Sequence, residues 1–277
     1  MNKTVAEKRA AFRALHQQGC FMLPNPWDAG SARMLQELGF LALASTSSGS
    51  AWTSGKPDYA VTRDEVLQQL TTLSAAVDLP VNADYETGFA GEPEELAKNV
   101  TLAVKTGVAG LSIEDRVVGD LGKLYDTPLA VERLRAARAA IDKTGEDVIL
   151  VARTEGLLIG GSASDAIDKL VAFADAGADC LYAPGIGMAG LSTKEDVATL
   201  VKAVAPKPVN ILAIGPEISF AEYTDLGVRR LSVGGALSLV GWAAFVEAAK
   251  KLKDGYFDGL AGGFSNRKLN EIFGRFV

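Results

Sequence analysis

Short apolar runs alternate with longer amphipathic segments along most of the chain. Eight such runs end in small or polar residues, as buried strands do where they meet a loop, and they begin near Phe21, Leu41, Pro80, Gly110, Val148, Cys180, Pro208 and Arg229. The segments between them carry apolar residues at helical spacing, and several begin at a capping residue and end at glycine. We therefore predict eight β/α units between residue 21 and roughly residue 234.

This regular order predicts the fold class. Eight alternating strands and helices favour a closed (β/α)8 barrel over an open sheet. The pattern also predicts a helix within residues 1–19 and a polar, aromatic tail over residues 264–277. Because no linker or shift in composition divides the chain, we expect one domain over residues 1–277 with a C-terminal extension from about residue 255.

One segment approaches the length of a membrane span. It runs from Leu231 to Ala249 and has a single charge, at Glu247. Its three glycines and two serines favour a buried strand followed by a buried helix instead. The first 19 residues lack the apolar block of a secretory signal. We expect a cytoplasmic protein that does not enter a membrane.

Charge and composition exclude other classes. The chain has 28 basic and 34 acidic residues, a net charge of -6, so nucleic acid is not an expected partner. Its only histidine, His16, lies in the N-terminal helix, and Cys20 and Cys180 stand where strands begin, so a Ser-His-Asp triad and a zinc site are not expected. No lysine ends a strand, which disfavours a Schiff-base aldolase; Lys56 and Lys123 lie on loops and could be electrophiles or solvated surface groups.

Acidic residues follow two of the predicted strands. Asp84 and Glu86 end one strand, and Glu114 and Asp115 end the next. In a barrel these carboxyl ends meet at one mouth, where carboxylates repel one another unless a cation holds them. Oxygen ligands without histidine suit Mg²⁺ or Mn²⁺, so Asp84, Glu86 and Glu114 predict a metal site. The alternative is that each acid caps a helix or pairs with arginine, and for Asp115 alone we favour that structural role.

Two further features point to the same mouth. Arg153 ends another strand, where it could clamp a carboxylate and stabilise an enolate, or could instead pair with Glu114 or Glu155. The segment over residues 44–59 is rich in Ser, Thr and Gly, so its amides could approach an anion such as a substrate carboxylate. Asp58 in that segment could reach the site or serve as a turn residue.

Taken together, these motifs resemble the isocitrate lyase and phosphoenolpyruvate mutase superfamily in its smaller, one-domain branch. The matching segments are NPWDAGSARMLQELGF, ASTSSG, KPDY, VNADYETGF, SIEDR, VARTEG, PVNIL and SVGGAL. The resemblance implies a (β/α)8 barrel whose last helices are exchanged between subunits of a dimer or tetramer. It also implies Mg²⁺ bound to the carboxylate and keto oxygen of a 2-oxo acid.

The resemblance assigns roles by position. It implies that Asp84, Glu86 and Glu114 hold the metal, some through water. Ser47, Ser48 and Gly49 are then the carboxylate cradle, Arg153 the cation that binds substrate and stabilises an enolate, Asp58 an acid near the reacting centre, and Asn210 a polar group of the pocket.

The sequence departs from the superfamily in three places. The lyases that cleave isocitrate or methylisocitrate carry a Lys-Lys/Arg-Cys-Gly-His motif where this chain has EDRVVGDLGKLYDTP. Of the loop typical of the phosphonate enzymes only Lys123 resembles a fragment. Ile211, Leu212 and Ala213 stand where the lyases have polar residues, which predicts an unusually apolar pocket.

These observations favour a Mg²⁺-dependent lyase or decarboxylase that acts on a small 2-oxo acid such as oxaloacetate. The alternatives are carbon–phosphorus chemistry, a sugar-phosphate site formed by the segments around Ala213 and Gly234, and a 2-oxo acid binding protein without turnover.

Overall fold

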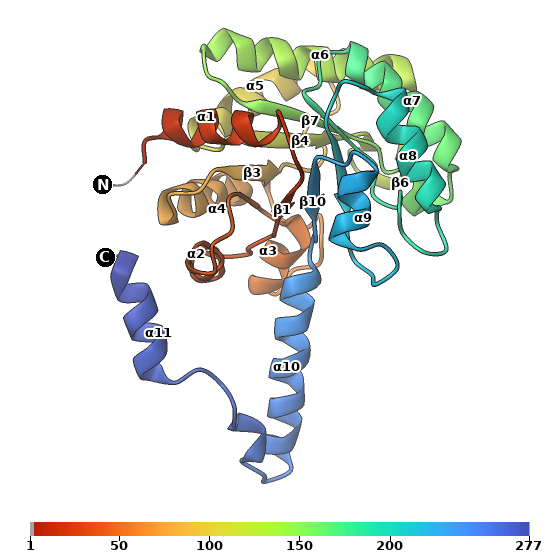
Figure 1. The fold of residues 1–277 in the computed structure, drawn as a ribbon. Helices are drawn as coiled ribbons and strands as arrows, with labels where there is room; N and C mark the ends of the chain where they lie inside the picture. Colours follow the sequence, from red (N-terminus) through yellow and green to blue (C-terminus); the bar gives the residue numbers. More distant parts are fainter. Residues whose placement is uncertain (1–2, 277) are drawn as a thin grey trace.

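The computed structural model describes residues 3–276 and places eight parallel strands in a nearly closed barrel surrounded by helices (Figure 1). The strands are β1 (Phe21–Leu23), β2 (Leu43–Ala44), β3 (Val81–Asp84), β4 (Gly110–Glu114), β7 (Ile149–Arg153), β8 (Cys180–Tyr182), β9 (Val209–Leu212) and β10 (Arg230–Ser232). They pair in the order β1, β10, β9, β8, β7, β4, β3, β2, and the Ala44 amide donates to the Pro24 carbonyl at 3.1 Å beside β1. The predicted (β/α)8 barrel is confirmed.

Helices cover the outside of the barrel, as Figure 1 shows. They are α1 (Val5–Leu15), α2 (Ala29–Glu37), α3 (Ser47–Thr53), α4 (Arg63–Ala76), α5 (Pro93–Lys105), α6 (Thr127–Thr144), α7 (Ala163–Asp175), α8 (Lys194–Ala203) and α9 (Phe220–Asp225), with a 3₁₀ turn η1 (Gly156–Ile159). Capping boxes at Thr4, Thr62 and Thr193 start α1, α4 and α8 by pairing free backbone amides. Met1, Asn2 and Val277, which belong to the predicted N-terminal helix segment and tail, lie outside the described residues.

Strand alternation separates two apolar layers. Residues such as Val209 and Ile211 pack outward against the helices. Inside the barrel, Phe21, Ile149 and Tyr182 share a cluster with Phe12, which α1 inserts from the side opposite the carboxyl ends. This inner cluster closes the N-terminal end of the barrel, so the carboxyl ends are the side on which a cavity can open.

Two local elements differ from the sequence expectation. The Ser/Thr/Gly-rich segment after β2 contains the helix α3, which begins at the cap Thr46, where a loop was predicted. The segment after β4 forms a two-stranded hairpin of β5 (Arg116–Val117) and β6 (Asp120–Leu124). Both insertions lie at the carboxyl ends of strands and therefore shape the mouth of the barrel.

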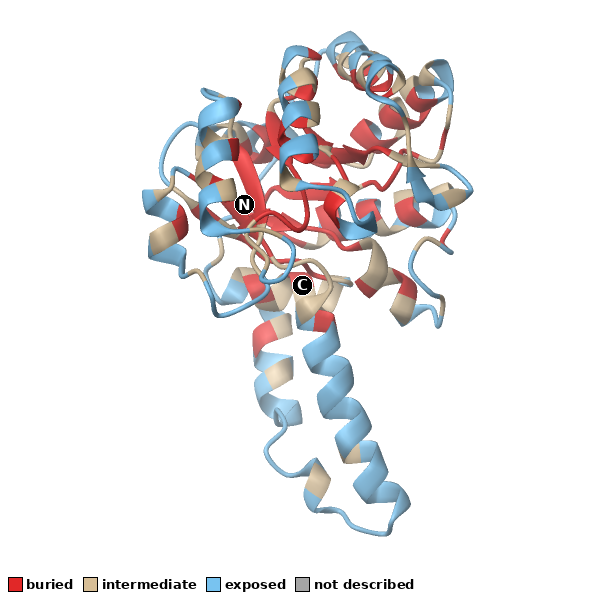
Figure 2. Cartoon of the chain, turned by 90° about the vertical axis from the view of Figure 1, so that its right-hand side faces the viewer, coloured by how far each residue is buried: buried red, intermediate tan, exposed pale blue. Residues whose placement is uncertain are grey.

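The C-terminal segment leaves the barrel, which contradicts the predicted buried helix. The strand part of Leu231–Ala249 is buried as expected, but only Ser238 of α10 (Ala236–Lys253) is buried, and Figure 2 shows the rest of α10 exposed beyond the barrel. Apolar composition predicted burial, yet the chain's own barrel offers no surface along most of this helix. Among the described helices, α10 included, none combines the length and apolar content needed to cross a membrane.

The chain then returns toward the barrel. After η2 (Asp258–Leu260), α11 (Asn266–Phe273) and η3 (Gly274–Phe276) lie beside α2 (Figure 1). Arg275 pairs with Glu37, and the Arg33 guanidinium lies 5.3 Å from the centroid of the Phe276 ring. The predicted tail thus contains the helix α11, and the turn that follows it packs on the same chain.

Candidate active site

A cavity of about 180 Å³ opens among the carboxyl ends of the barrel strands. Asp84 and Arg153, each the last residue of its strand, form part of its wall together with Asp58. Residues nearer the strand starts form its inner end: Asn82, Asn210 and Arg230. The cavity is smaller than the ~300–1,000 Å³ of pockets for drug-sized ligands, so it fits a small molecule.

The three predicted metal acids converge beside this cavity. Asp84 is half-buried, and Glu86 and Glu114 are buried. Burial, reinforced by the neighbouring Asp84 and Glu114 carboxylates, raises the pKa of Glu86 to about 9. Burial also raises the pKa of Glu114, with Arg153 opposing the shift. Glu86 Oε1 is buried without a hydrogen-bond partner. The mouth thus gathers more carboxyl groups than Arg153 can neutralise, and Glu86 keeps a proton near pH 7 unless a cation is present.

A tight loop fixes the position of Glu86. Glu86 and Phe89 adopt left-handed backbone angles, φ 50° and 58°, on either side of Gly88. A side chain at Gly88 would meet the Leu96 side chain at 2.1 Å, so this position requires glycine. Arg133 of α6 is buried and donates to the Thr87 carbonyl at 2.6 Å and to the Gly91 carbonyl at 2.5 Å. The loop is therefore anchored to α6 as well as to β3.

Arg153 lies among these acids and forms the ion pairs that one of its two sequence interpretations predicted, and it also lines the cavity. Its Nη1 is 3.1 Å from Asp84 Oδ1, its Nε is 3.4 Å from Glu114 Oε2, and it also pairs with Glu155. The carboxylates raise its pKa well above the ordinary value despite burial, which acts in the opposite direction. The guanidinium thus stays charged at the edge of the cavity, oriented by the acids around it.

The segment after β2 brings the predicted cradle to the same wall. The Ser47 amide donates to Asp84 Oδ2 at 3.0 Å, and the Gly49 amide donates to Thr46 Oγ1 at 3.3 Å. Ser47 and Ser48 line the cavity, whereas Gly49 is buried against Trp27 behind it. The structure thus brings two of the three predicted cradle residues to the cavity.

Asp58 joins the cavity wall from the segment between α3 and α4. Although the residue as a whole is exposed, desolvation of its carboxyl group raises its pKa, and the nearby Asp84 carboxylate adds to this shift. The Tyr59 amide donates to Asp58 Oδ1 at 3.1 Å and acts in the opposite direction. Asp58 therefore reaches the site, which is one of the two positions that the sequence left open for it.

Asn210 lies inside the barrel, as expected. The prediction that the pocket around it is apolar is wrong. Leu212 lines the cavity, whereas Ile211 is fully buried toward the helices and Ala213 packs in the same outer layer. Strand alternation explains this, because residues next to an inward-facing side chain face outward. The inner cavity wall consists mainly of amide and hydroxyl groups, including Asn210 Nδ2, which donates to Ser232 Oγ at 3.0 Å.

The remaining candidates have structural partners. Asp115 is buried and accepts from Thr154 Oγ1 at 2.7 Å, with Lys169 Nζ also at 2.7 Å, in line with the structural role favoured for it. Lys56 pairs with Glu65, and Lys123 pairs with Asp120 on the exposed hairpin. Within residues 3–276, no group of three or more His, Cys, Asp or Glu side chains is arranged to hold a metal ion.

Sequence reasoning missed two tyrosines of this site. Tyr59 Oη donates to Glu114 Oε1 at 2.8 Å. The Tyr182 ring lies 5.2 Å from the Arg153 guanidinium and lines the cavity; burial raises the Tyr182 pKa to about 12, which keeps its proton in place at neutral pH. Tyr182 could have been found from the sequence, because it is the last residue of β8 and strand ends form the mouth of the barrel. Tyr59 depends on a left-handed backbone angle, φ 61°, that its sequence does not reveal.

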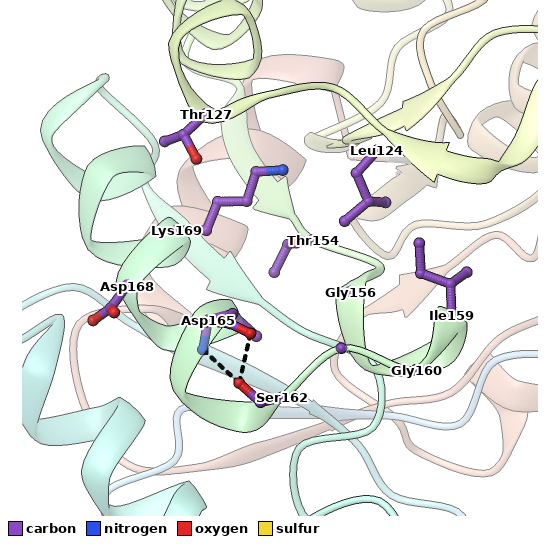
Figure 3. A pocket seen from close by; sticks show the side chains of 12 residues that line it. Leu124, Thr127, Thr154, Gly156, Ile159, Gly160, Ser162, Asp165, Asp168 and Lys169 are labelled. Atoms are coloured by element: carbon purple, nitrogen blue, oxygen red, sulfur yellow. Dashed lines mark hydrogen bonds between the residues drawn. The ribbon is translucent and has the colours of Figure 1, made fainter.

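A larger cavity, of about 620 Å³, lies between β6, η1 and the start of α7 (Figure 3). Ser162 and Asp165, joined by dashed lines in Figure 3, cap the start of α7. Lys169 forms an ion pair with Asp115. Asp165 and Lys169 are thus engaged within the fold, and Asp168, the remaining charged residue of this cavity wall, is exposed. The smaller cavity, with its convergent acids and Arg153, is the better candidate active site.

Comparison with known proteins gives one consistent result. The profile of the Phosphoenolpyruvate phosphomutase family matches residues 12–253. A protein of Burkholderia cenocepacia J2315, described only provisionally as a lyase/mutase, has a crystal structure that is 41% identical with a TM-score of 0.92, covering 98% of this chain and 97% of that one.

Two other proteins have established names. Oxaloacetate decarboxylase of Rhodopseudomonas palustris (strain BisB5) is 30% identical over 92% of this chain and 86% of the relative. The structure of oxaloacetate acetylhydrolase with the product oxalate is 28% identical with a TM-score of 0.84, covering 98% of this chain and 94% of that one. The resemblance found in the sequence is thereby confirmed: the chain belongs to the phosphoenolpyruvate phosphomutase family, within the PEP mutase/isocitrate lyase superfamily.

Proposed function

We propose that this protein is a Mg²⁺-dependent carbon–carbon lyase, with Mn²⁺ as a possible substitute, that converts oxaloacetate or a similar small 2-oxo acid. For oxaloacetate the reaction breaks the bond between C3 and C4, releases CO₂ and leaves the enolate of pyruvate, which then gains a proton. The observation that carries the proposal is that Asp84 and Arg153 line one small cavity while Glu86 and Glu114 lie beside them. The relative named oxaloacetate decarboxylase supports this choice of substrate.

The residues at the mouth fit a divalent cation. Glu86 Oε1 is buried without a partner, and burial together with neighbouring carboxylates raises the pKa of Glu86 and Glu114. A cation would relieve both features, and oxygen ligands are those that Mg²⁺ prefers. We propose that Asp84, Glu86 and Glu114 hold it, some through water. When bound, the ion supplies positive charge to the keto oxygen as the enolate develops.

The chain's own groups have separate tasks in this proposal. Ser47 and Ser48, which line the cavity at the start of α3, bind the carboxylate next to the keto group. Gly49 completes the cradle behind them through its amide, which donates to Thr46 Oγ1. Arg153, held in orientation by its acidic partners, stabilises the negative charge of the enolate.

Three more residues complete the proposed assignment. Asp58 acts as an acid or base beside the reacting centre, since the pKa of its carboxyl group is raised. Asn210 belongs to the polar wall that orients the substrate. Tyr182 is neutral near pH 7 because its pKa is raised, and either this phenol or water donates the proton that the enolate gains.

The experiment is an assay of pyruvate release from oxaloacetate with Mg²⁺, with EDTA, and without protein. We expect metal-dependent release above the spontaneous rate, and equal rates with and without protein would overturn the proposal. Calorimetry of oxalate binding with and without Mg²⁺ accompanies this assay, and oxalate binding without pyruvate release would favour a binding protein without turnover. Release of phosphate or pyruvate from phosphonopyruvate, without turnover of oxaloacetate, would favour carbon–phosphorus chemistry.

We also propose that residues 1–277 form one domain that assembles in the cytoplasm as a homo-oligomer through α10 and the extension from about residue 255. Val240 and Phe245 of α10 and Phe257 beyond it are more than 60% exposed, which is a large apolar surface for a subunit alone. Light scattering at micromolar concentration should give a dimer or tetramer, and Val240→Glu with Phe245→Glu should reduce it to a monomer. A wild-type monomer would contradict the proposal.

A further inference from the structure

The cavity extends inward past the acidic mouth, and its inner end has a different character. Asn82, Asn210 and Arg230 each lie two residues before Asp84, Leu212 and Ser232 on their strands. Since alternate residues of a strand face the same side, these three side chains form the next layer inside the barrel. All of them line the cavity. The inner end is therefore built from two amides and one guanidinium.

Arg230 is buried there without a carboxylate. Its side chain is 2% exposed, its Nε donates to Asn210 Oδ1 at 2.9 Å, and its Nη1 donates to Asn82 Oδ1 at 3.2 Å. No ion pair in residues 3–276 includes it. The ionisable groups that favour its charge are the Cys180 thiol and the Tyr182 phenol, and burial raises the pKa of both. Both groups are therefore neutral near pH 7.

The remaining neighbour does not supply negative charge either. His16 Nε2 lies 3.4 Å from Arg230 Nη1, and burial together with Arg230 lowers the His16 pKa to about 3. His16 Nδ1 lies 2.8 Å from the Phe12 carbonyl, which assigns the proton of the neutral ring to Nδ1 and leaves Nε2 to accept from Arg230. The inner end thus holds one positive charge surrounded by neutral groups.

The other buried arginines are satisfied differently. Arg9 pairs with Glu146, and Arg153 pairs with three carboxylates. Arg133 has three backbone carbonyl partners and lies over the Tyr125 ring, away from this cavity. Of these arginines, only Arg230 combines a missing carboxylate with a place on the cavity wall. A buried charge without a counter-ion is costly, so a small anion that enters the cavity gains by approaching it.

We propose that the inner end of the cavity is a second anion subsite, in which Arg230 binds the distal carboxylate of a small dicarboxylate whose 2-oxo acid end lies at Asp84 and Arg153. This inference rests on the proposed function and specifies its substrate class as a dianion. Asn82 and Asn210 hold the guanidinium in orientation, and the volume of about 180 Å³ restricts the ligand to a few carbons. Arg230 is thus a residue that determines specificity.

The subsite predicts how kinetic constants respond. When the distal carboxylate leaves as CO₂ it loses its charge, so Arg230 stabilises bound oxaloacetate more than the transition state. Replacement of Arg230 should therefore raise KM without lowering kcat by a similar factor. A purely structural arginine would instead lower kcat and stability together.

The direct test compares two ligands that cannot lose CO₂ in this way. Pyruvate carries one carboxylate, and 3-sulfopyruvate carries a sulfonate in place of the second. By calorimetry with Mg²⁺ present, the wild-type protein should bind 3-sulfopyruvate at least about tenfold more tightly than pyruvate, or about 1.4 kcal/mol. Arg230→Met should remove this preference and leave the pyruvate affinity within about twofold. A preference that persists in Arg230→Met, or an equal loss for both ligands, would overturn the subsite.

A second variant covers the case in which Arg230→Met does not fold. Asn82→Asp places a carboxylate beside Arg230 Nη1 with almost no change of shape. It should retain the fold and pyruvate binding but lose the preference for 3-sulfopyruvate, because the subsite is then neutralised from within. Asn270→Asp, exposed on α11, is the matched control and should keep the preference.

The outcomes separate this inference from the proposed reaction. If the wild-type protein prefers 3-sulfopyruvate through Arg230 but does not turn over oxaloacetate, the proposed reaction is overturned and the subsite is supported. Turnover together with equal affinity for the two ligands, or with no binding of either, would overturn the subsite alone.

Discussion

The mouth and the inner end of the cavity each contain an arginine, half-buried at the mouth and buried at the inner end, and the two have opposite surroundings. At the mouth, Arg153 lies among Asp84, Glu114 and Glu155, while Glu86 remains unpartnered. At the inner end, the polar partners of Arg230 among residues 3–276 are two side-chain amides and the neutral His16. Carboxyl groups thus outnumber basic groups at one end, and a guanidinium lies without a carboxylate at the other, about one strand layer apart.

This difference indicates what each end requires. Excess carboxylate at the mouth favours a cation, and uncompensated guanidinium at the inner end favours an anion. A metal-bound 2-oxo acid with a second anionic group would satisfy both at once. The polarity of the cavity therefore supports the substrate class more directly than any single residue does.

Removal of Asp84 should have the largest effect on this polarity. Asp84→Ala should leave the fold intact and reduce kcat/KM for oxaloacetate by about 10³-fold, the upper end for loss of one electrostatic group. Calorimetric Mn²⁺ binding should weaken in parallel. Asp120→Ala, at an exposed carboxylate on the hairpin, should change neither value. Unchanged turnover with retained metal affinity in Asp84→Ala would exclude this residue from the metal site.

Replacement of the mouth arginine should have the next largest effect. Arg153→Met should lower kcat by about 10²-fold, since the enolate loses its cationic partner. Arg153→Lys should recover part of this loss, because it keeps the charge but not the planar fork. Steady-state kinetics of both variants, beside Arg135→Met at an exposed position of α6, provide the test. Equal kcat in Arg153→Met and wild type would show that Arg153 serves only to pair the acids.

His16, behind the inner end, should affect stability rather than catalysis. The folded-state pKa of His16 is about 3, below the ordinary 6.5, so between these values the unfolded chain binds a proton that the folded chain does not. The free energy of unfolding should therefore fall as pH decreases below 6.5, by at most about 1.4 kcal/mol per pH unit from this residue. Urea unfolding at pH 7 and pH 5 should show a smaller decrease for His16→Gln. The same decrease in both proteins would place His16 in a solvated site.

Periodicity was sufficient for the barrel because strand alternation and helix caps are local properties of the sequence. The acids at the mouth were predictable for the same reason, since Asp84, Glu114 and Arg153 end strands and carboxyl ends meet at one edge. The roles of these residues in chemistry remain predictions that the experiments above test.

The inner end was not predicted, because it depends on contacts between distant segments. Arg230 and Asn82 are 148 positions apart, and His16 reaches Arg230 from a helix that seemed remote from any site. The exposed α10 was missed for a related reason: apolar composition shows that a helix needs a covering surface, but not whether that surface belongs to the same chain. The left-handed backbone at Tyr59 likewise has no signal in its own residue type.

The most direct test of the central claim is a comparison of kcat/KM for oxaloacetate, isocitrate and methylisocitrate with Mg²⁺ under one condition. Cleavage of either tricarboxylate leaves a carbanion that needs a well-placed acid, and the segment after β4 has no cysteine to supply one. Because general acid catalysis contributes about 10²–10⁴-fold, oxaloacetate should be preferred at least about a hundredfold, and EDTA should abolish its turnover. Efficient cleavage of isocitrate or methylisocitrate, or oxaloacetate turnover that EDTA leaves unchanged, would contradict the account.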